Sequence, residues 1–172
     1  NRSNEIADRA GIPPSSITAY LKTLIGLGLV ERRVPFGENE RSKRSMYRIK
    51  DPAFLFWYRF VAPYVTAIEG GLGERLSRRL LESDARFEYE GHLFERICGQ
   101  WVLRQARDGA LPLEPTFVGS WWGTDPLEHA QTDIDLVAAD DLDGKLLLGE
   151  CKWRNEMDET DVVRTLLDRQ HL

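Results

Sequence analysis

The spacing of apolar residues changes along the chain, and these changes mark out successive helices and strands. Near the N-terminus, Ile6, Ala7 and Ala10 fall on one helical face, and Gly11 ends that helix. A second helix follows the Pro-Pro-Ser-Ser segment and ends at Gly26 and Gly28. Its apolar positions recur at helical spacing: Ile17, Tyr20, Leu21, Leu24 and Leu27. Residues 29–51 then form two short extended runs around a charged loop, the pattern of a β-hairpin.

Helix, turn, helix and hairpin in this order resemble the winged helix-turn-helix of microbial regulators, with residues 19–33 typical of the end of a recognition helix. The resemblance implies a second helix in the DNA major groove and wing cations on phosphates. The implied DNA-binding residues are Ser15, Ser16, Thr18, Lys22, Arg32, Arg33, Arg41, Lys43 and Arg44. Two other interpretations remain open. The wing bases can be a solvated loop balanced by Glu38 and Glu40, and winged helices also dock proteins.

Charge is distributed unevenly between the two parts of the chain. Residues 1–50 hold ten Lys and Arg against five Asp and Glu, whereas the remainder holds 13 bases against 23 acids. This division predicts two modules with different partners, the basic one suited to an anionic polymer.

An aromatic segment connects the two modules. Asp51 and Pro52 suit the N-cap and first position of a helix. Six aromatic residues follow within eleven positions: Phe54, Phe56, Trp57, Tyr58, Phe60 and Tyr64. Aromatics on all sides of a helix predict burial between two bodies, with base stacking as the alternative. A short second helix follows the glycine-rich break at residues 69–74.

From residue 84 the pattern predicts a helix, three strands and a helix. The long helix spans 84–109, and its predicted apolar stripe consists of Phe87, Phe94, Ile97, Cys98 and Trp101. The predicted strands cover 115–123, 131–140 and 145–153, and a helix covers 159–172. A further strand would be expected after it.

Ionisable residues occupy positions in this region where apolar ones are expected. Asp135 shares a strand face with Asp133, and Glu150 and Lys152 continue the face of the last predicted strand. Glu95 lies next to the apolar stripe of the long helix. Buried carboxylates repel one another and are costly to desolvate, so their convergence predicts a divalent cation with oxygen ligands. A lysine beside them can orient an attacking water or stabilise charge on a phosphate.

The residues F-E at 94–95, D-I-D at 133–135 and E-C-K at 150–152 resemble the PD-(D/E)XK motif of the restriction-endonuclease-like superfamily. The match of D-I-D-L-V-A to its Holliday-junction-resolvase and Mrr-like branch is close. The resemblance implies catalytic roles for Glu95, Asp135, Glu150 and Lys152, with Asp135, Glu150 and Glu95 binding Mg²⁺ or Mn²⁺. A salt-bridged surface pair or a charged edge strand is the structural alternative.

Taken together, the chain resembles the C-terminal part of a family of prokaryotic DEXX-box ATPases. The family implies an upstream AAA+-type ATPase domain; no G-x-x-x-x-G-K-[ST] motif occurs here, so ATP would bind only through that domain, which is absent from this chain. We expect a fragment of a longer protein with a mixed α+β fold. The expected domains are a winged helix at 1–52, a helical connector at 53–83 and an incomplete nuclease-like domain at 84–172.

These patterns predict a cytoplasmic, DNA-binding region with metal-dependent deoxyribonuclease activity; a homo-oligomer is left open. The alternatives are a DNA-binding, oligomerisation or regulatory module with a degenerate nuclease fold, or a regulator that uses the winged helix alone. No stretch reaches the roughly 20 apolar residues of a membrane span. Cys98 and Cys151 lie in apolar patterns without a Cys/His cluster, which argues against zinc and disulfides.

Overall fold

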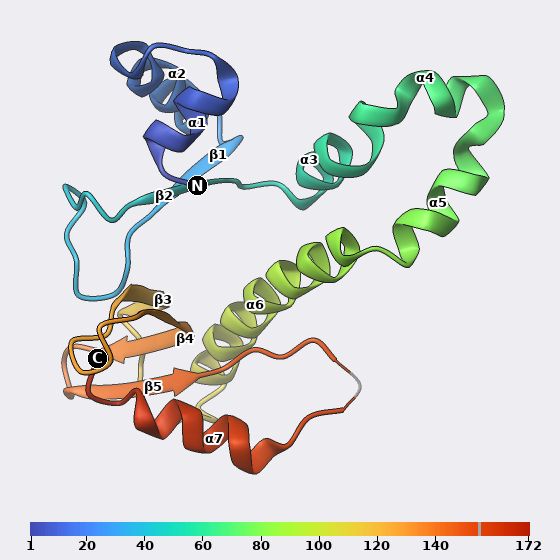
Figure 1. The fold of residues 1–172 in the computed structure, drawn as a ribbon. Coiled ribbons are helices and arrows are strands. Elements are labelled where there is room, and N and C mark those ends of the chain that lie inside the picture. The colour runs from blue at the N-terminus through green and yellow to red at the C-terminus, as the bar shows by residue number, and fades with distance from the viewer. Residues whose placement is uncertain (155) are drawn as a thin grey trace. The chain divides into compact units, whose positions relative to one another are not determined.

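A computed structural model describes residues 1–154 and 156–172, which form two compact units. The first unit comprises residues 1–34 and 38–86, and the second comprises 35–37 and 87–172. The fold is mixed α+β, with a two-stranded and a three-stranded sheet, both antiparallel (Figure 1). No described helix combines the length and apolar character that crossing a membrane requires.

The first unit begins with a winged helix-turn-helix, as predicted. Helix α1 (Ser3–Ala10) ends at Gly11, whose φ of 63° is the left-handed conformation that glycine adopts easily. Helix α2 (Pro14–Gly26) follows, and strands β1 (Val30–Arg33) and β2 (Met46–Ile49) pair antiparallel as the wing. Ala7, Ile17 and Leu21 form the buried core of this unit.

The connector is a series of short helical segments. These are α3 (Pro52–Phe56), η1 (Trp57–Val61), η2 (Ala62–Tyr64), α4 (Val65–Ala67), η3 (Ile68–Leu72) and α5 (Gly73–Leu81). Asp51 caps α3 as expected, since its carboxylate accepts hydrogen bonds from the N–H groups of Ala53 and Phe54.

The predicted burial of the connector aromatics is not observed. Among the six, all within the described residues, only Phe60 is buried. Rings four residues apart pair along the helical segments instead. The centroids of Phe54 and Tyr58 are 6.4 Å apart, and those of Phe56 and Phe60 are 5.3 Å apart.

The second unit follows the predicted order of helix, three strands and helix. Helix α6 (Asp84–Arg107) is followed by β3 (Phe117–Thr124), β4 (Gln131–Asp140), β5 (Lys145–Gly149) and α7 (Glu159–Asp168). The strands are ordered β3-β4-β5, so β4 is central and its second half is buried.

Helix α6 packs on this sheet with a face that only partly overlaps the predicted stripe. Phe87, Ile97 and Trp101 of the proposed stripe are exposed, while Val102 is buried and Cys98 packs beside it on Leu136 and Ala138. A Cβ added to Gly99 would lie 3.7 Å from Val118 Cγ1. Small residues therefore form the contact face, because they let the helix approach the sheet closely.

Two details of the sheet differ from simple alternation. Strand β5 ends at Gly149, so Glu150 and Lys152 follow the strand rather than lying within it as predicted. On the other side of β4, Gly119 pairs with Val137 and Trp121 with Ile134. Two residues of β4, Asp135 and Leu136, thus lie opposite Ser120 alone, which is a β-bulge. Bulges re-aim side chains and are common beside functional sites.

Candidate functional site

Asp135 and the segment after β5 meet at one end of the sheet. The last pair in the ladder between β4 and β5 is Leu136 with Gly149, and continuing this register brings Asp135 opposite Glu150. The Cys151 N–H donates a hydrogen bond of 2.8 Å to Asp135 Oδ2. Because Cys151 stands between Glu150 and Lys152, this bond joins the aspartate to the Glu-Cys-Lys segment.

Asp135 experiences a strongly acidic environment. Burial is the main cause that raises the pKa of its carboxyl group above the ordinary value, and the Cys151 N–H opposes this rise. The negative charges of Glu150, Glu95 and Asp133 raise the pKa of Asp135 further. The predicted acids are therefore close enough to interact.

Glu150 is largely enclosed and has two cationic partners. Its side chain is 13 % exposed. Lys152 Nζ donates to Glu150 Oε1, and Arg169 Nη1 lies 3.7 Å from Glu150 Oε2. The ion pair with Lys152 matches the salt-bridged alternative considered from the sequence.

Glu95 lies on α6 and is partly buried. Its Oε1 atom is 3.4 Å from His92 Nδ1. The segment after Lys152 is tied to the same helix, since the Trp153 indole N–H donates to Glu90 Oε2 at 3.0 Å and the Trp153 and Phe94 rings are 5.3 Å apart. These contacts hold the Glu-Cys-Lys segment next to α6.

The residues that could hold a metal ion offer the right donor chemistry without a complete ligand shell. Among the described residues, no group of three or more His, Cys, Asp or Glu side chains is arranged to hold a metal ion. Mg²⁺ commonly binds through one or two carboxylates and keeps several waters. Asp135 and Glu150 meet that smaller requirement, with Glu95 nearby.

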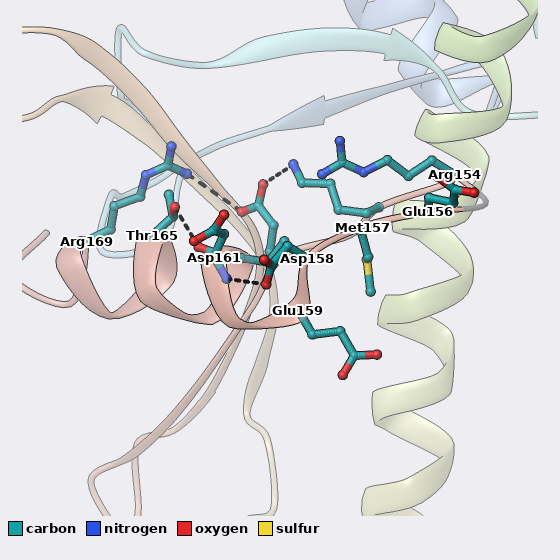
Figure 2. A pocket seen from close by; sticks show the side chains of 11 residues that line it. Arg154, Glu156, Met157, Asp158, Glu159, Asp161, Thr165 and Arg169 are labelled. Carbon is teal, nitrogen blue, oxygen red and sulfur yellow. Dashed lines mark hydrogen bonds and ion pairs between the residues drawn. The ribbon is translucent and has the colours of Figure 1, made fainter.

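A pocket of about 950 Å³ opens beside Glu150 and Lys152. Helix α7 and the segment before it form much of its lining, and Arg169 reaches in from the end of that helix (Figure 2). Four acids also line it: Glu156, Asp158, Glu159 and Asp161. Asp158 caps α7, accepting hydrogen bonds from two backbone N–H groups. The pocket is large enough for a small ligand.

Arg169 was not identified from the sequence. Besides approaching Glu150, its Nη1 donates to the backbone oxygen of Asp133 at 3.0 Å. Its position just after α7 resembles an ordinary cation at a helix C-terminus. Only the fold shows that it reaches the acidic site.

The predicted DNA-binding residues fall into two groups in the first unit. On α2, Ser15, Thr18 and Lys22 are exposed and Ser16 is partly buried. The cations of the wing differ in their partners. Arg32 bonds the backbone oxygens of Glu40 and Ser42 and the Ser45 hydroxyl.

Other wing cations are also engaged, while two project outward. Arg44 pairs with Glu38 at 3.0 Å. Arg33 lies in β1 and is partly buried. Arg41 and Lys43 are exposed. Arg32 and Arg44 therefore shape the loop, whereas Arg41 and Lys43 are better placed to contact a phosphate.

Comparisons with known proteins agree with this organisation. Residues 2–34 match the IclR helix-turn-helix domain, which indicates a DNA-binding unit. Over 165 residues the chain is 32% identical to the uncharacterized protein MJECL04 of Methanocaldococcus jannaschii. The aligned region covers 95% of this chain and 35% of that protein. The chain thus spans about a third of the length of this curated relative. No solved structure matches the chain.

A second protein family matches more than half of the chain. Residues 57–164, from the connector into α7, match DUF234, described as "Archaea bacterial proteins of unknown function". The match includes Glu95, Asp135, Glu150 and Lys152. The chain belongs to this DUF234 family of archaeal and bacterial proteins.

Proposed function

We propose that this region binds duplex DNA through its winged helix-turn-helix and hydrolyses phosphodiesters at a metal-dependent centre formed by Asp135, Glu150 and Lys152. The observation that carries the proposal is the hydrogen bond from the Cys151 N–H to Asp135 Oδ2. It joins the carboxylate at the β4 bulge to a segment that carries a second carboxylate and a lysine. The order α6, β3, β4, β5, α7 also agrees with the core implied by the PD-(D/E)XK resemblance.

Asp135 and Glu150 would hold Mg²⁺ or Mn²⁺, with Glu95 as an accessory carboxylate. Such an ion supplies Lewis acidity and a bound water of lowered pKa. The acidity around Asp135 supports this assignment, because mutually repelling carboxylates favour a divalent cation between them. Ligation of Glu150 would require it to give up part of its contact with Lys152 or Arg169.

Lys152 would act on the phosphate and the attacking water. Its ammonium group has three donors, and one is sufficient for the contact with Glu150. The remaining donors can orient a water toward phosphorus and stabilise negative charge on the phosphate oxygens. Glu150 accepts a hydrogen bond from this ammonium group.

DNA would be held by the first unit. Ser15, Thr18 and Lys22 on α2 would face the major groove, and Arg41 and Lys43 of the wing would contact phosphates. Replacing both wing cations, as in Arg41→Gln with Lys43→Gln, should reduce the slope of log affinity against log salt by about two. The measurement is fluorescence anisotropy with labelled duplex DNA over a salt series. An unchanged slope would remove both residues from the interface.

One structural feature favours a second candidate function, a non-catalytic DNA-binding or regulatory module. Glu150 is neutralised by Lys152 and Arg169, and the described residues contain no three-ligand metal group. In this alternative the centre is a structural ion-pair network, and the acidic second unit contacts another protein or another copy of the chain.

Cleavage assays separate the two candidates. The protein is incubated with supercoiled, linear and branched DNA in the presence of Mg²⁺ or Mn²⁺, alongside Asp135→Asn and Lys152→Ala. Asp143→Asn and Lys145→Ala are matched controls, because they change an exposed ion pair at the opposite end of β5. The nuclease proposal expects cleavage by the parent and both controls and its loss in the two site variants. Equal cleavage by Lys152→Ala, or none by the parent, would contradict it.

The proposed function also includes an ATPase domain upstream of this region. We place this region in a longer protein with an upstream ATPase domain, as the family resemblance in the sequence implies. The length of the relative supports this, since the chain spans only 35% of it. ATP would bind to that domain and not to residues of this chain.

A further inference from the structure

Arg169 connects three separate segments of the second unit. It directly follows α7, its Nη1 donates to the Asp133 backbone oxygen on β4 at 3.0 Å, and the same nitrogen lies 3.7 Å from Glu150 Oε2 after β5. Its side chain is 27% exposed. The guanidinium is thus anchored on the sheet while it contacts the carboxylate.

This contact restrains the Glu150 side chain from outside its own segment, whose backbone is tied to Asp135 by the Cys151 N–H. Glu150 follows the last ladder residue of β5, Gly149, so no strand pairing holds it. Its Oε1 contacts Lys152, which belongs to the same short segment and moves with it. Arg169 reaches Glu150 from another element, and its Nη1 lies within ion-pair distance of Glu150 Oε2 while it donates to the Asp133 backbone oxygen.

We infer that Arg169 is a positioning residue of the proposed centre, which orients Glu150 toward Asp135 so that both carboxylates can bind one divalent cation. The inference rests on the proposed function and adds a residue to it from the C-terminal helix. Arg169 does not ligate the ion or contact the reacting atoms in this role. It acts through Glu150, much as outer groups orient the ligands of metal sites.

The sign of the charge makes this role testable. Arg169 is positive, so by Coulomb's law its removal would strengthen the binding of a cation at Glu150. Loss of alignment would weaken that binding instead. A variant that loses a positive charge and nevertheless binds the cation less tightly therefore reports positioning.

The experiment measures Mn²⁺ binding to the 172-residue chain without DNA, by the electron paramagnetic resonance signal of free Mn²⁺. Arg169→Gln should weaken binding about 10-fold, the lower end of the effect typical for groups that orient metal ligands. Arg169→Lys keeps the charge but places it on a side chain of different length and shape, so this variant should bind Mn²⁺ with intermediate affinity. Arg164→Gln is the matched control, because it removes the same charge from an exposed pair with Asp161 on the same helix. The Mn²⁺ affinity of Arg164→Gln should match that of the parent.

A merely structural role is tested with His171→Gln. His171 Nε2 contacts Asp125 Oδ1 at 3.1 Å, so this variant loosens the same end of the chain without touching Glu150. If Arg169 positions Glu150, His171→Gln should keep the Mn²⁺ affinity of the parent, even where its melting temperature falls as much as that of Arg169→Gln. Equal weakening in the two variants at equal loss of melting temperature would overturn the inference. So would unchanged or tighter binding by Arg169→Gln.

Mn²⁺ binding by the parent protein separates the role of Arg169 from the existence of the metal centre. If the parent binds Mn²⁺ and Arg169→Gln binds it equally well, the role of Arg169 is refuted and the metal centre stands. If the parent binds no Mn²⁺, the metal centre itself is refuted and the inference falls with it.

Discussion

Gly149 is the residue at which an added methyl group should disturb the sheet next to the candidate site. A Cβ built on Gly149 would lie 3.2 Å from Leu136 Cδ2 and 3.3 Å from Leu136 Cβ, which is closer than ordinary contact. Leu136 cannot easily move away, because it is 7% exposed and packs with Val102 and Ala138 in the core of the second unit. We therefore expect Gly149→Ala to be overpacked.

The expected cost follows from two opposing effects. Overpacking a filled core typically costs about 1–3 kcal/mol. Replacing glycine by alanine offsets about 0.4–1 kcal/mol of this by restricting the unfolded chain. Taking the middle of each range, Gly149→Ala should lower the free energy of unfolding by roughly 1.3 kcal/mol. Urea unfolding followed by tryptophan fluorescence measures it.

A control and a double-mutant cycle test the cause. Gly91→Ala on α6 meets nothing within 4 Å and should raise stability by about 0.5–1 kcal/mol, the helix-propensity difference. In a Leu136→Ala background, Gly149→Ala should cost less, with a coupling of about 1 kcal/mol. Gly149→Ala as stable as the parent, or an equal cost in both backgrounds, would refute the packing argument.

Two further predictions concern the C-terminal turn and the winged helix. Asp125 raises the pKa of His171 by accepting its hydrogen bond, so the stabilisation is full below the ordinary histidine value of about 6.5 and is lost as pH rises through the folded pKa. The melting temperature of the parent should exceed that of His171→Gln most at about pH 5.5 and least at alkaline pH; a difference that grows with pH would contradict this. Leu21→Ala, in the core of the first unit, should cost about 2–5 kcal/mol and abolish DNA binding, measured by urea unfolding and anisotropy. Unimpaired DNA binding by that variant would show that the folded α2 is not required.

The order of helices and strands could be predicted from the sequence, whereas the contacts between them could not. Strand β4 was predicted at its observed bounds, 131–140, because alternating positions lead into a short apolar run at 136–139 that ends at turn-forming residues. The end of β5 was missed, since Glu-Cys-Lys-Trp continues an alternating pattern. The Cys151 N–H bonds the Asp135 side chain, a tertiary contact that periodicity does not encode.

The face of α6 was only partly predicted, for a related reason. Large side chains such as Phe87 and Trp101 suggest a core, yet the sheet is contacted through Cys98, Gly99 and Val102. Which face packs depends on how closely the helix can approach, and spacing alone does not give this. The bulge at Asp135 and the reach of Arg169 likewise require the register and the folded chain.

The pairing of Glu150 with two cations leads to a last prediction, on the linkage between metal and phosphate. Lys152 is engaged with Glu150, so a phosphate entering the pocket competes with a carboxylate for its ammonium group. A divalent cation on Glu150 would satisfy that carboxylate and leave Lys152 able to bind the phosphate, while Arg169 keeps its contact with Glu150. Metal and phosphate binding should therefore be cooperative, each strengthening the other by the same factor.

This linkage can be measured without catalysis. Ca²⁺ is a hard cation for oxygen ligands. With Ca²⁺ in place of Mg²⁺, DNA should bind about 5-fold or more tightly than in EDTA at matched ionic strength, the low end of typical coupling. The gain should vanish in Asp135→Asn and persist in Asp143→Asn, whose exposed carboxylate pairs with Lys145. If Ca²⁺ changes DNA affinity equally in both variants, the ion acts by general screening, and the Glu150 network is a structural ion pair rather than a centre for phosphate chemistry.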